Sequence, residues 1–225
     1  MTLAVSHEGF VATVSGAAGV PAADVLELLL ALAAEDAARA VVLDLTVPPA
    51  EASEAAEPAD PSVLRAVELS PLPLVAALAG EITSPVLDLA CAADIRTCDE
   101  AAVLRFVTFG TRRQMILLGQ AGTVDLLRRG GRFDAQAAFM AGFVTHVAAS
   151  GDALADARAV AATITARGPI ATRMAKEAVW RGLEMPLAQA LRFETDLTLL
   201  LQTTKDRAEG VQAFLEKRPP SFTGS

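Results

Sequence analysis

Apolar runs of strand length alternate with longer helical patterns through the first two thirds of the chain. Residues 3–5 and 10–14 are two β-leaning runs, and the segment from Ser6 to Gly9 between them has the length and the glycine of a hairpin loop. Residues 25–32 are apolar over more than a narrow stripe, which predicts a helix buried between two layers. Residues 40–45 are apolar on both faces, which predicts a strand in a covered sheet. The chain thus begins in the order strand, strand, helix, strand.

The stretch from residue 73 to residue 96 carries the clearest pattern. It begins with an apolar run of strand length, breaks at Gly80, and offers Ser84 as a helix N-cap with Pro85 at the first helical position. The apolar run that follows predicts a buried helix. A helix N-terminus carries unpaired N–H groups and the positive end of the helix dipole. Chemistry that develops negative charge is therefore expected between Gly80 and Asp88.

The rhythm of two strands and a helix recurs beyond this stretch. Short apolar runs, polar breaks and a capped helix follow one another up to residue 147. The predicted elements are strands at 95–98, 102–107 and 143–147, a helical region at 110–129, a turn at 130–133, and a helix from Asp134 to Gly142.

Two segments depart from this rhythm. Residues 48–61 are rich in proline, alanine and acidic residues, which predicts a long loop, and residues 62–69 form a short amphipathic helix. From Leu154 onward the pattern predicts only helices. We therefore divide the chain into an α/β core, residues 1–153, and a C-terminal helical region, residues 154–225.

Composition narrows the class of partner. The chain is 52% hydrophobic, which allows a sizeable core, and it carries a net charge of −8 with a pI near 4.8. Nucleic acid and anionic membranes would be repelled by this charge. The chain has no run of 18 apolar residues, and its start lacks a basic region followed by a long apolar run. We expect a soluble, cytoplasmic protein without a nucleic-acid or membrane partner.

The thiols and imidazoles suggest no chemistry of their own. Cys91 and Cys98 lie in apolar surroundings without a CxxC or His-spaced partner, so we expect buried thiols and no metal site. His7 and His146 have no Ser or Cys partner that would argue for a catalytic triad. A group of arginines is interpreted as a solvated helix face. Its members are Arg112, Arg113, Arg128, Arg129 and Arg132.

Three blocks of this sequence resemble the enoyl-CoA hydratase/isomerase family, also called the crotonase family. Residues 73–96 are similar to its strand, Gly-rich turn, helix and terminal Cys-Asp, and residues 130–147 to its Gly-Arg, Ala, Ala, Gly-Leu-Val pattern. Residues 168–222 resemble its helical tail, which ends in Ala-Phe-Leu-Glu-Lys-Arg and Pro-Ser-Phe. The resemblance implies an α/β fold, a crotonase-like spiral of ββα units followed by a C-terminal helical trimerisation region. Trimers of the family often pair into hexamers.

The same resemblance implies an acyl-CoA thioester as ligand or substrate, with no other cofactor and no metal. In the family, two backbone N–H groups hold the thioester oxygen as it becomes an enolate, and one or two carboxylates move protons. Donors fixed in advance cost no reorganisation as charge develops. Asp88 falls on the position of the first catalytic glutamate and is the sole candidate acid/base. Its alternative role is to favour the positive end of the helix.

The oxyanion region implied by the resemblance contains Ala59, Ser84, Pro85 and Val86. The Ala59 N–H is the candidate for the first donor, in a Pro-Ala-Asp turn. The family glycine that supplies the second donor corresponds to Pro85, which has no N–H; Ser84 or Val86 could replace it only if the loop were rebuilt. The second catalytic glutamate has no counterpart in residues 106–110, which disfavours water addition by two carboxylates.

The CoA end of the family site corresponds to three residues near the C-terminus. Phe214 and Lys217 occupy positions that in the family contact the adenine and phosphates of CoA bound to a neighbouring subunit, and Arg218 is adjacent. The alternative is that Lys217 and Arg218 only complement a helix C-terminus.

Two main functions remain open at this point, and a purely structural partner subunit of a related enzyme is a third option. The first is an enzyme that stabilises an acyl-CoA enolate in hydration, isomerisation or decarboxylation, with Asp88 as acid/base. The second is a non-catalytic acyl-CoA-binding or accessory subunit that has lost the oxyanion hole and the second carboxylate. The carboxylate at position 88 favours the enzyme, whereas Pro85 favours the binding protein.

Overall fold

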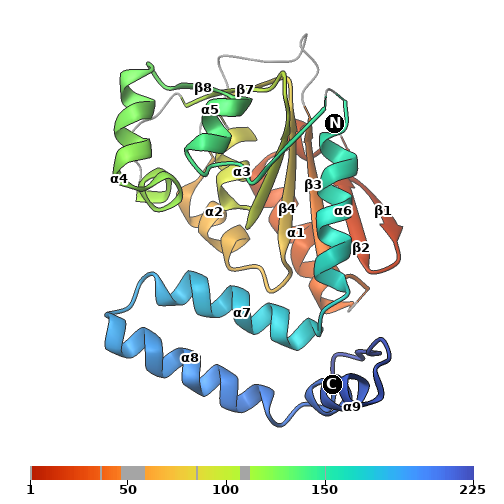
Figure 1. Cartoon of the computed structure of the whole chain (residues 1–225). Coiled ribbons are helices and arrows are strands. Elements are labelled where there is room, and N and C mark those ends of the chain that lie inside the picture. Colours follow the sequence, from red (N-terminus) through yellow and green to blue (C-terminus); the bar gives the residue numbers. More distant parts are fainter. Residues whose placement is uncertain (1, 36, 47–58, 85, 107–111, 150) are drawn as a thin grey trace.

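Six strands form the large sheet at the centre of the computed structural model, which describes residues 2–35, 37–46, 59–84, 86–106, 112–149 and 151–225 (Figure 1). In spatial order they are β1 (Ala4–Glu8), β2 (Val11–Ser15), β3 (Ala40–Thr46), β4 (Leu74–Ala79), β6 (Ile95–Asp99) and β9 (His146–Ala148). β1 and β2 are antiparallel, which confirms the predicted hairpin. The later neighbours all pair in parallel.

A second, small sheet consists of β5 (Glu81–Ile82), β7 (Val103–Arg105) and β8 (Arg132–Asp134). Gly80, in the left-handed region with φ 82°, makes the corner at which β4 leaves the large sheet and β5 enters the small one. β6 and β7 divide between the sheets in the same way. Because β4 pairs with β6 and β5 pairs with β7, successive strand pairs stack as turns of a spiral. The predicted spiral of ββα units is confirmed.

Helices cover both faces of the large sheet. On one face, Leu43 of β3 and Leu74 of β4 are fully buried in a core that also holds Leu29 of α1 (Ala22–Ala34). On the other face, sheet residues pack against Ala157 and Ala161 of α6 (Ala153–Thr165), whose small side chains let the helix approach closely. The sheet is therefore apolar on both sides, as the sequence predicts for residues 40–45.

The remaining helices surround the small sheet or project from the core. Their bounds are α2 (Pro61–Glu68), α3 (Val86–Ala92), α4 (Arg112–Arg128), α5 (Ala135–Met140), α7 (Pro169–Gly182), α8 (Leu187–Leu201) and α9 (Lys205–Glu216), and a 3₁₀ turn spans Ala17–Gly19. α7 and α8 lie side by side below the core, with α9 beyond them (Figure 1). α6 lies on the sheet although it follows the expected boundary at residue 153, and the two-part division of the chain stays a prediction.

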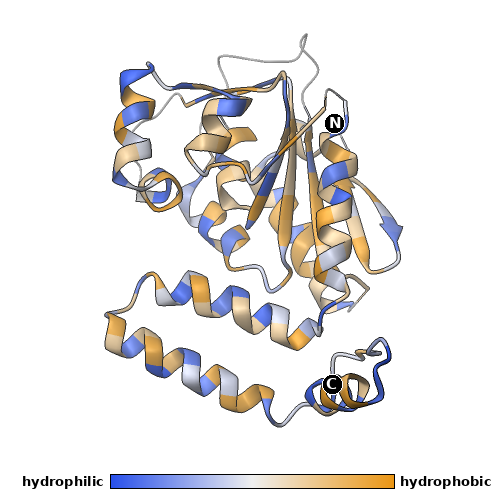
Figure 2. Cartoon of the chain, viewed as in Figure 1, coloured by the Kyte–Doolittle hydropathy of each residue, from blue (hydrophilic) through white to orange (hydrophobic). Residues whose placement is uncertain are grey.

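Hydrophobic residues are interspersed with hydrophilic ones along the projecting helices (Figure 2), and several of the hydrophobic side chains are exposed. Leu187 and Leu191 of α8 are 75% and 55% exposed, and Phe214 of α9 is 82% exposed. By contrast, the residues after α9 are held in place, because the Asp206 carboxylate accepts hydrogen bonds from the Thr223 and Gly224 N–H groups at 2.7 and 2.9 Å. An ordered tail beside exposed leucines indicates a preformed surface.

Two short elements differ from the sequence prediction. The predicted turn at residues 130–133 contributes the strand β8, because the left-handed Gly130 and Gly131 turn the chain back against β7. The last strand begins at His146 instead of residue 143. The N–H groups of Phe143 and Val144 bond to the Ala138 carbonyl at the end of α5 and cannot join the sheet.

Candidate functional site

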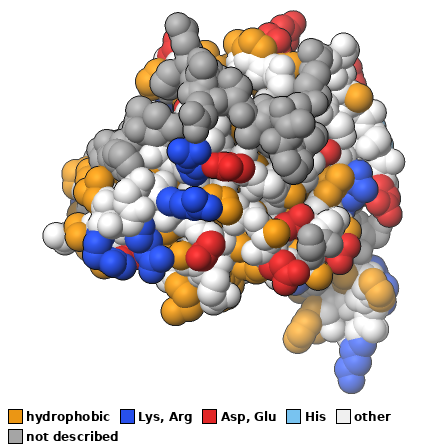
Figure 3. All heavy atoms as spheres, turned by 90° about the horizontal axis from the view of Figure 1, so that it is seen from above, with side chains coloured by type: hydrophobic (Ala, Val, Ile, Leu, Met, Phe, Trp, Pro, Cys, Tyr) orange, Lys and Arg blue, Asp and Glu red, His pale blue; other side chains and the backbone are white. Residues whose placement is uncertain are grey.

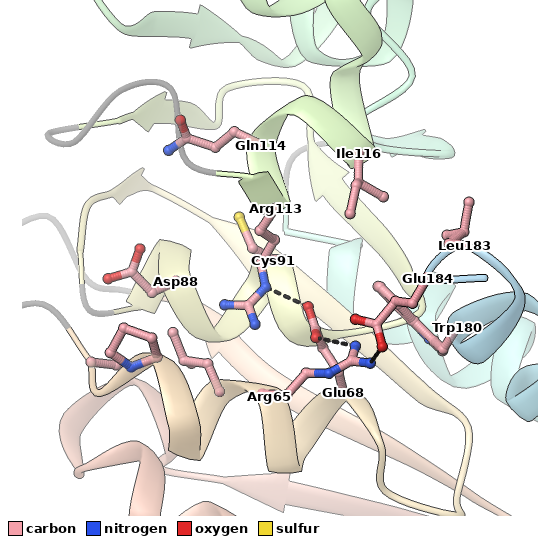
Figure 4. A pocket seen from close by; sticks show the side chains of 13 residues that line it. Arg65, Glu68, Asp88, Cys91, Arg113, Gln114, Ile116, Trp180, Leu183 and Glu184 are labelled. Carbon is pink, nitrogen blue, oxygen red and sulfur yellow. Dashed lines mark hydrogen bonds and ion pairs between the residues drawn. The ribbon is translucent and has the colours of Figure 1, made fainter. Parts of the chain in front are cut away.

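A pocket of about 450 Å³ opens between α2, α3, the start of α4 and the end of α7 (Figure 4). Leu64, Ile116, Trp180 and Leu183 give it apolar walls. The segments that meet here are far apart in the chain, and α7 lies below the start of the β4 strand (Figure 1). Such a mixed pocket with a few polar groups is the usual form of a small-molecule site.

Asp88 enters this pocket from the first turn of α3. Its Oδ2 atom is buried and accepts no hydrogen bond from the residues that the structure describes. Burial raises the pKa of the Asp88 carboxyl, an effect opposed by hydrogen bonds from the Ser84 hydroxyl and the Ala59 N–H and by the nearby charge of Arg113. A carboxylate with one unsatisfied oxygen and a raised pKa is suited to accept a proton.

A chain of charged side chains lies beside Asp88 (Figure 4). The Arg113 Nε atom donates to Glu68 Oε1, and Arg65 bonds the other oxygen of Glu68 at 3.0 Å. Arg65 also pairs with Glu184 Oε2 at 2.8 Å. The side chain of Glu68 is only 5% exposed, and the two arginines compensate its buried carboxylate through ion pairs. The network fixes the guanidinium of Arg113 next to Asp88.

α7 is held against the pocket by a second group of contacts. Asp94, which follows α3, accepts a hydrogen bond from Trp180 Nε1 at 2.7 Å and pairs with Lys176 Nζ at 2.8 Å. Lys176 also donates to the Leu72 carbonyl at 2.9 Å, and its side chain is 8% exposed. Because Trp180 lines the pocket, these bonds position a wall of the site.

The structure brings together part of the predicted site. Asp88 and Ala59 line the pocket, and Ser84 contacts Asp88 through its hydroxyl. Val86 is half-buried and packs against the main core. Pro85 lies outside the described residues, as do residues 107–110 of the segment searched for a second carboxylate.

The three residues expected at the CoA end lie on or just after α9, away from this pocket. Phe214 is exposed, and Lys217 follows the helix in the left-handed conformation with φ 54°. Arg218 bonds Glu209 at 2.6 and 2.9 Å and Glu216 at 2.6 Å. The ion pairs of Arg218 with Glu209 and Glu216 thus stabilise the end of α9.

Sequence reasoning missed Arg113 as a site residue. The interpretation of the arginine group as one solvated helix face is wrong for Arg113, because its side chain is 19% exposed and lines the pocket. The interpretation as a solvated helix face fits Arg128 and Arg129, which pair with Asp125 on the surface. On the face that Figure 3 shows, basic and acidic side chains lie next to one another. Only the fold brings Glu68 to Arg113, 45 positions along the chain.

Thiol and metal chemistry find no support among the described residues. Cys91 and Cys98 are buried free thiols, as predicted, and burial raises the pKa of Cys91 to about 12. That part of the chain contains no cluster of three or more His, Cys, Asp or Glu residues placed to hold a metal ion. Its helices are all too short or too polar to cross a membrane.

The model of the enoyl-CoA hydratase/isomerase family matches residues 24–225. The chain belongs to this family. YngF of Bacillus subtilis, named as a candidate enoyl-CoA hydratase/isomerase, is 39% identical over 163 residues, which are 68% of this chain and 63% of YngF. Probable enoyl-CoA hydratase 2, mitochondrial, of Arabidopsis thaliana is 34% identical over 168 residues, or 71% of this chain and 56% of that protein. The chain thus spans less than two thirds of the length of these curated relatives.

Solved structures share the fold of this chain. An enoyl-CoA hydratase from Bacillus anthracis superimposes with a TM-score of 0.82 at 26% identity, covering 100% of both chains. DspI of Pseudomonas aeruginosa gives a TM-score of 0.85 at 24% identity, covering 98% of this chain and 96% of DspI, which shows the fold alone. The crotonase-like fold with its C-terminal helical region is confirmed.

Proposed function

We propose that this protein binds an acyl-CoA thioester with the acyl group in the pocket beside Asp88, and that Asp88 removes a proton from the α-carbon. The observation that carries the proposal is the buried Oδ2 atom of Asp88, which has no hydrogen-bond partner among the described residues. An unpaired buried carboxylate oxygen costs stability, so its position in a ligand-sized pocket is best explained by a ligand that supplies the partner.

Isomerisation is the reaction that suits a single free carboxylate. Asp88 would take the α-proton to give the enolate and return the same proton at the γ-carbon, which moves the double bond without another reactant. Addition of water needs a second carboxylate to activate the water. Among the residues that the structure describes, the other carboxylates that line the pocket are Glu68 and Glu184, and both are bonded to Arg65. Hydration and decarboxylation are the less favoured forms of the proposal.

The CoA end is proposed to lie against a neighbouring subunit. Phe214 and Lys217 are exposed at the end of α9 and can cover an adenine and bond a phosphate from there. Arg218 is less suited to this role, since its guanidinium already pairs with Glu209 and Glu216. A homotrimer or hexamer and a cytoplasmic location complete the proposal, the latter supported by the two free thiols.

The test is exchange of the α-proton of butyryl-CoA in D₂O, followed by NMR. We expect wild-type protein to catalyse the exchange and Asp88→Asn to lower its rate by about 10²–10⁴, the usual contribution of a positioned acid/base. Asp125→Asn, which removes a surface carboxylate, should exchange at the wild-type rate. Equal rates for wild type and Asp88→Asn would remove Asp88 from the mechanism.

A non-catalytic acyl-CoA-binding role is the second candidate. It is favoured by the Ala59 N–H, which donates to the Asp88 carboxylate and is therefore not free for a thioester oxygen. Pro85 has no N–H to offer. Binding of butyryl-CoA by calorimetry without any α-proton exchange would establish this role instead of the enzymatic one.

A further inference from the structure

The guanidinium of Arg113 is only partly used by its protein contacts. It lies between Asp88 and Glu68 in the pocket (Figure 4), and its Nε atom donates to Glu68. Within the described part of the chain, Arg113 makes no other hydrogen bond or ion pair. Its two terminal NH₂ groups thus remain as donors beside the carboxylate that the proposed reaction uses.

The oxygen of an enolate formed beside Asp88 needs hydrogen-bond donors of this kind. The two backbone positions that the family resemblance implies as donors do not offer free N–H groups, because Pro85 has no N–H and the Ala59 N–H is directed at Asp88. Donors that are fixed before the reaction stabilise developing charge without reorganisation. Glu68, itself held by Arg65, fixes the plane of the Arg113 guanidinium in this way.

We propose that Arg113 is a catalytic residue that binds the thioester oxygen through its terminal N–H groups and stabilises the enolate; this rests on the proposed function. Asp88 forms an O–H bond with the α-proton as the C–H bond breaks. The C–H electron pair becomes the new C=C bond, and the carbonyl π pair moves to oxygen. Arg113 keeps its protons, and reprotonation at the γ-carbon restores the Asp88 carboxylate.

The charges of the pocket are consistent with this step. Among the described residues that line the pocket, Arg65 and Arg113 balance Glu68 and Glu184, which leaves the charge of ionised Asp88. As the proton moves, the negative charge passes from Asp88 to the enolate oxygen and stays beside Arg113. A substrate that brought its own carboxylate would add an unbalanced charge, which makes the enolate the better partner for this guanidinium.

The test uses 4-(dimethylamino)cinnamoyl-CoA, whose absorption moves to longer wavelength when its carbonyl oxygen is polarised. We expect a red shift on binding to wild-type protein and loss of most of that shift in Arg113→Gln, with binding retained. Exchange of the butyryl-CoA α-proton should fall by about 10²–10³ in the same variant. Arg128→Gln, which removes a surface arginine from the same helix, should behave as wild type.

Glu68→Gln separates this role from a structural one. The amide oxygen introduced by Glu68→Gln can still accept from Arg113, so the red shift should persist if Arg113 acts on the ligand directly. An unchanged red shift and exchange rate in folded Arg113→Gln, verified by circular dichroism, would overturn the inference and leave the proposed function standing. Failure of wild-type protein to bind butyryl-CoA would overturn both.

Discussion

Burial of the Asp88 carboxyl group destabilises the folded protein, and the same group is the acid/base of the proposed reaction. Its carboxyl group is half-buried, and one of its oxygens is unpaired among the described residues. Ser84 and Ala59 each donate a hydrogen bond, yet burial dominates and raises its pKa above the ordinary value of 3.8. The folded protein therefore binds a proton at Asp88 more tightly than the unfolded chain does.

The sign of this shift predicts how stability depends on pH. The contribution of Asp88 to stability falls as the pH rises from 3.8 through the folded pKa, and its full cost is present above the folded pKa. Asp88→Asn keeps an acceptor for Ser84 and Ala59 but removes the charge. We expect a higher melting temperature than wild type at pH 7, with the difference vanishing below pH 4, measured by thermal denaturation.

Asp125 provides the opposite case. Hydrogen bonds from Arg129 and Arg128 hold the pKa of this exposed carboxyl below its ordinary value. Any stability it contributes is present above pH 3.8 and is lost as the pH falls through the lowered pKa. The melting temperature of Asp125→Asn should therefore not exceed that of wild type at any pH. A pH profile of the same sign for both variants would contradict the burial argument for Asp88.

At the scale of elements, one carboxylate bonds two residues of α7 and links them to the core. Asp94 bonds both Lys176 and Trp180 of α7 and also accepts from the Leu74 N–H at the start of β4, at 2.8 Å. Burial lowers the pKa of Lys176, and Asp94 opposes that shift. Asp94 thus links α7, which forms a wall of the pocket, to the start of β4.

Removal of Asp94 should loosen this attachment. Asp94→Ala leaves Lys176 buried without its ion-pair partner, which typically costs about 3–5 kcal/mol of unfolding free energy. Urea denaturation measures this loss. Adding Lys176→Met should recover part of it, because the uncompensated charge is then gone.

A surface ion pair on the same helix serves as the control. Arg181 and Glu177 are 2.9 Å apart with both side chains well exposed, and such pairs contribute about 0.3–0.5 kcal/mol. Arg181→Ala should therefore change stability little. Equal losses for Asp94→Ala and Arg181→Ala would show that Asp94 does not anchor α7.

At the scale of the whole molecule, the exposed leucines of α8 and the exposed α9 point to assembly. Single exposed apolar residues are ordinary, but Leu187, Leu191, Leu199 and Leu200 lie on one 15-residue helix and are all more than half exposed. The proposed CoA contacts of Phe214 also require a neighbouring subunit. The exposed leucines, and the proposed role of Phe214, are consistent with the trimer that the family resemblance implies.

Assembly can be tested by light scattering. We expect a trimer or a hexamer for wild type and a shift toward monomer for Leu187→Glu with Leu191→Glu, because charged residues would have to be buried at the interface. Glu27→Gln, on α1, is the matched control and should assemble normally. A monomeric wild-type protein would contradict an oligomer interface on α8. It would also contradict the proposed contact between α9 and CoA bound to a neighbouring subunit.

The sequence by itself determined the features that depend on neighbours along the chain. The recurring order of two strands and a helix, the sheet covered on both faces and the position of Asp88 in the first turn of a helix all follow from local periodicity and capping, whereas the spiral arrangement of these units was implied by the family resemblance. The absence of an N–H at Pro85 is also a property of the residue alone. The resemblance supplied what periodicity could not, namely the family and its ligand.

Only the tertiary structure decided which distant side chains meet. The bond between Glu68 and Arg113 joins α2 to α4, and nothing in a local pattern separates Arg113 from a solvated arginine such as Arg128. Likewise, Arg218 has the charge to bind a phosphate, but the fold turns Glu209 toward it. Local sequence fixes the elements because their hydrogen bonds are mostly local, whereas the partners of long charged side chains depend on how those elements pack.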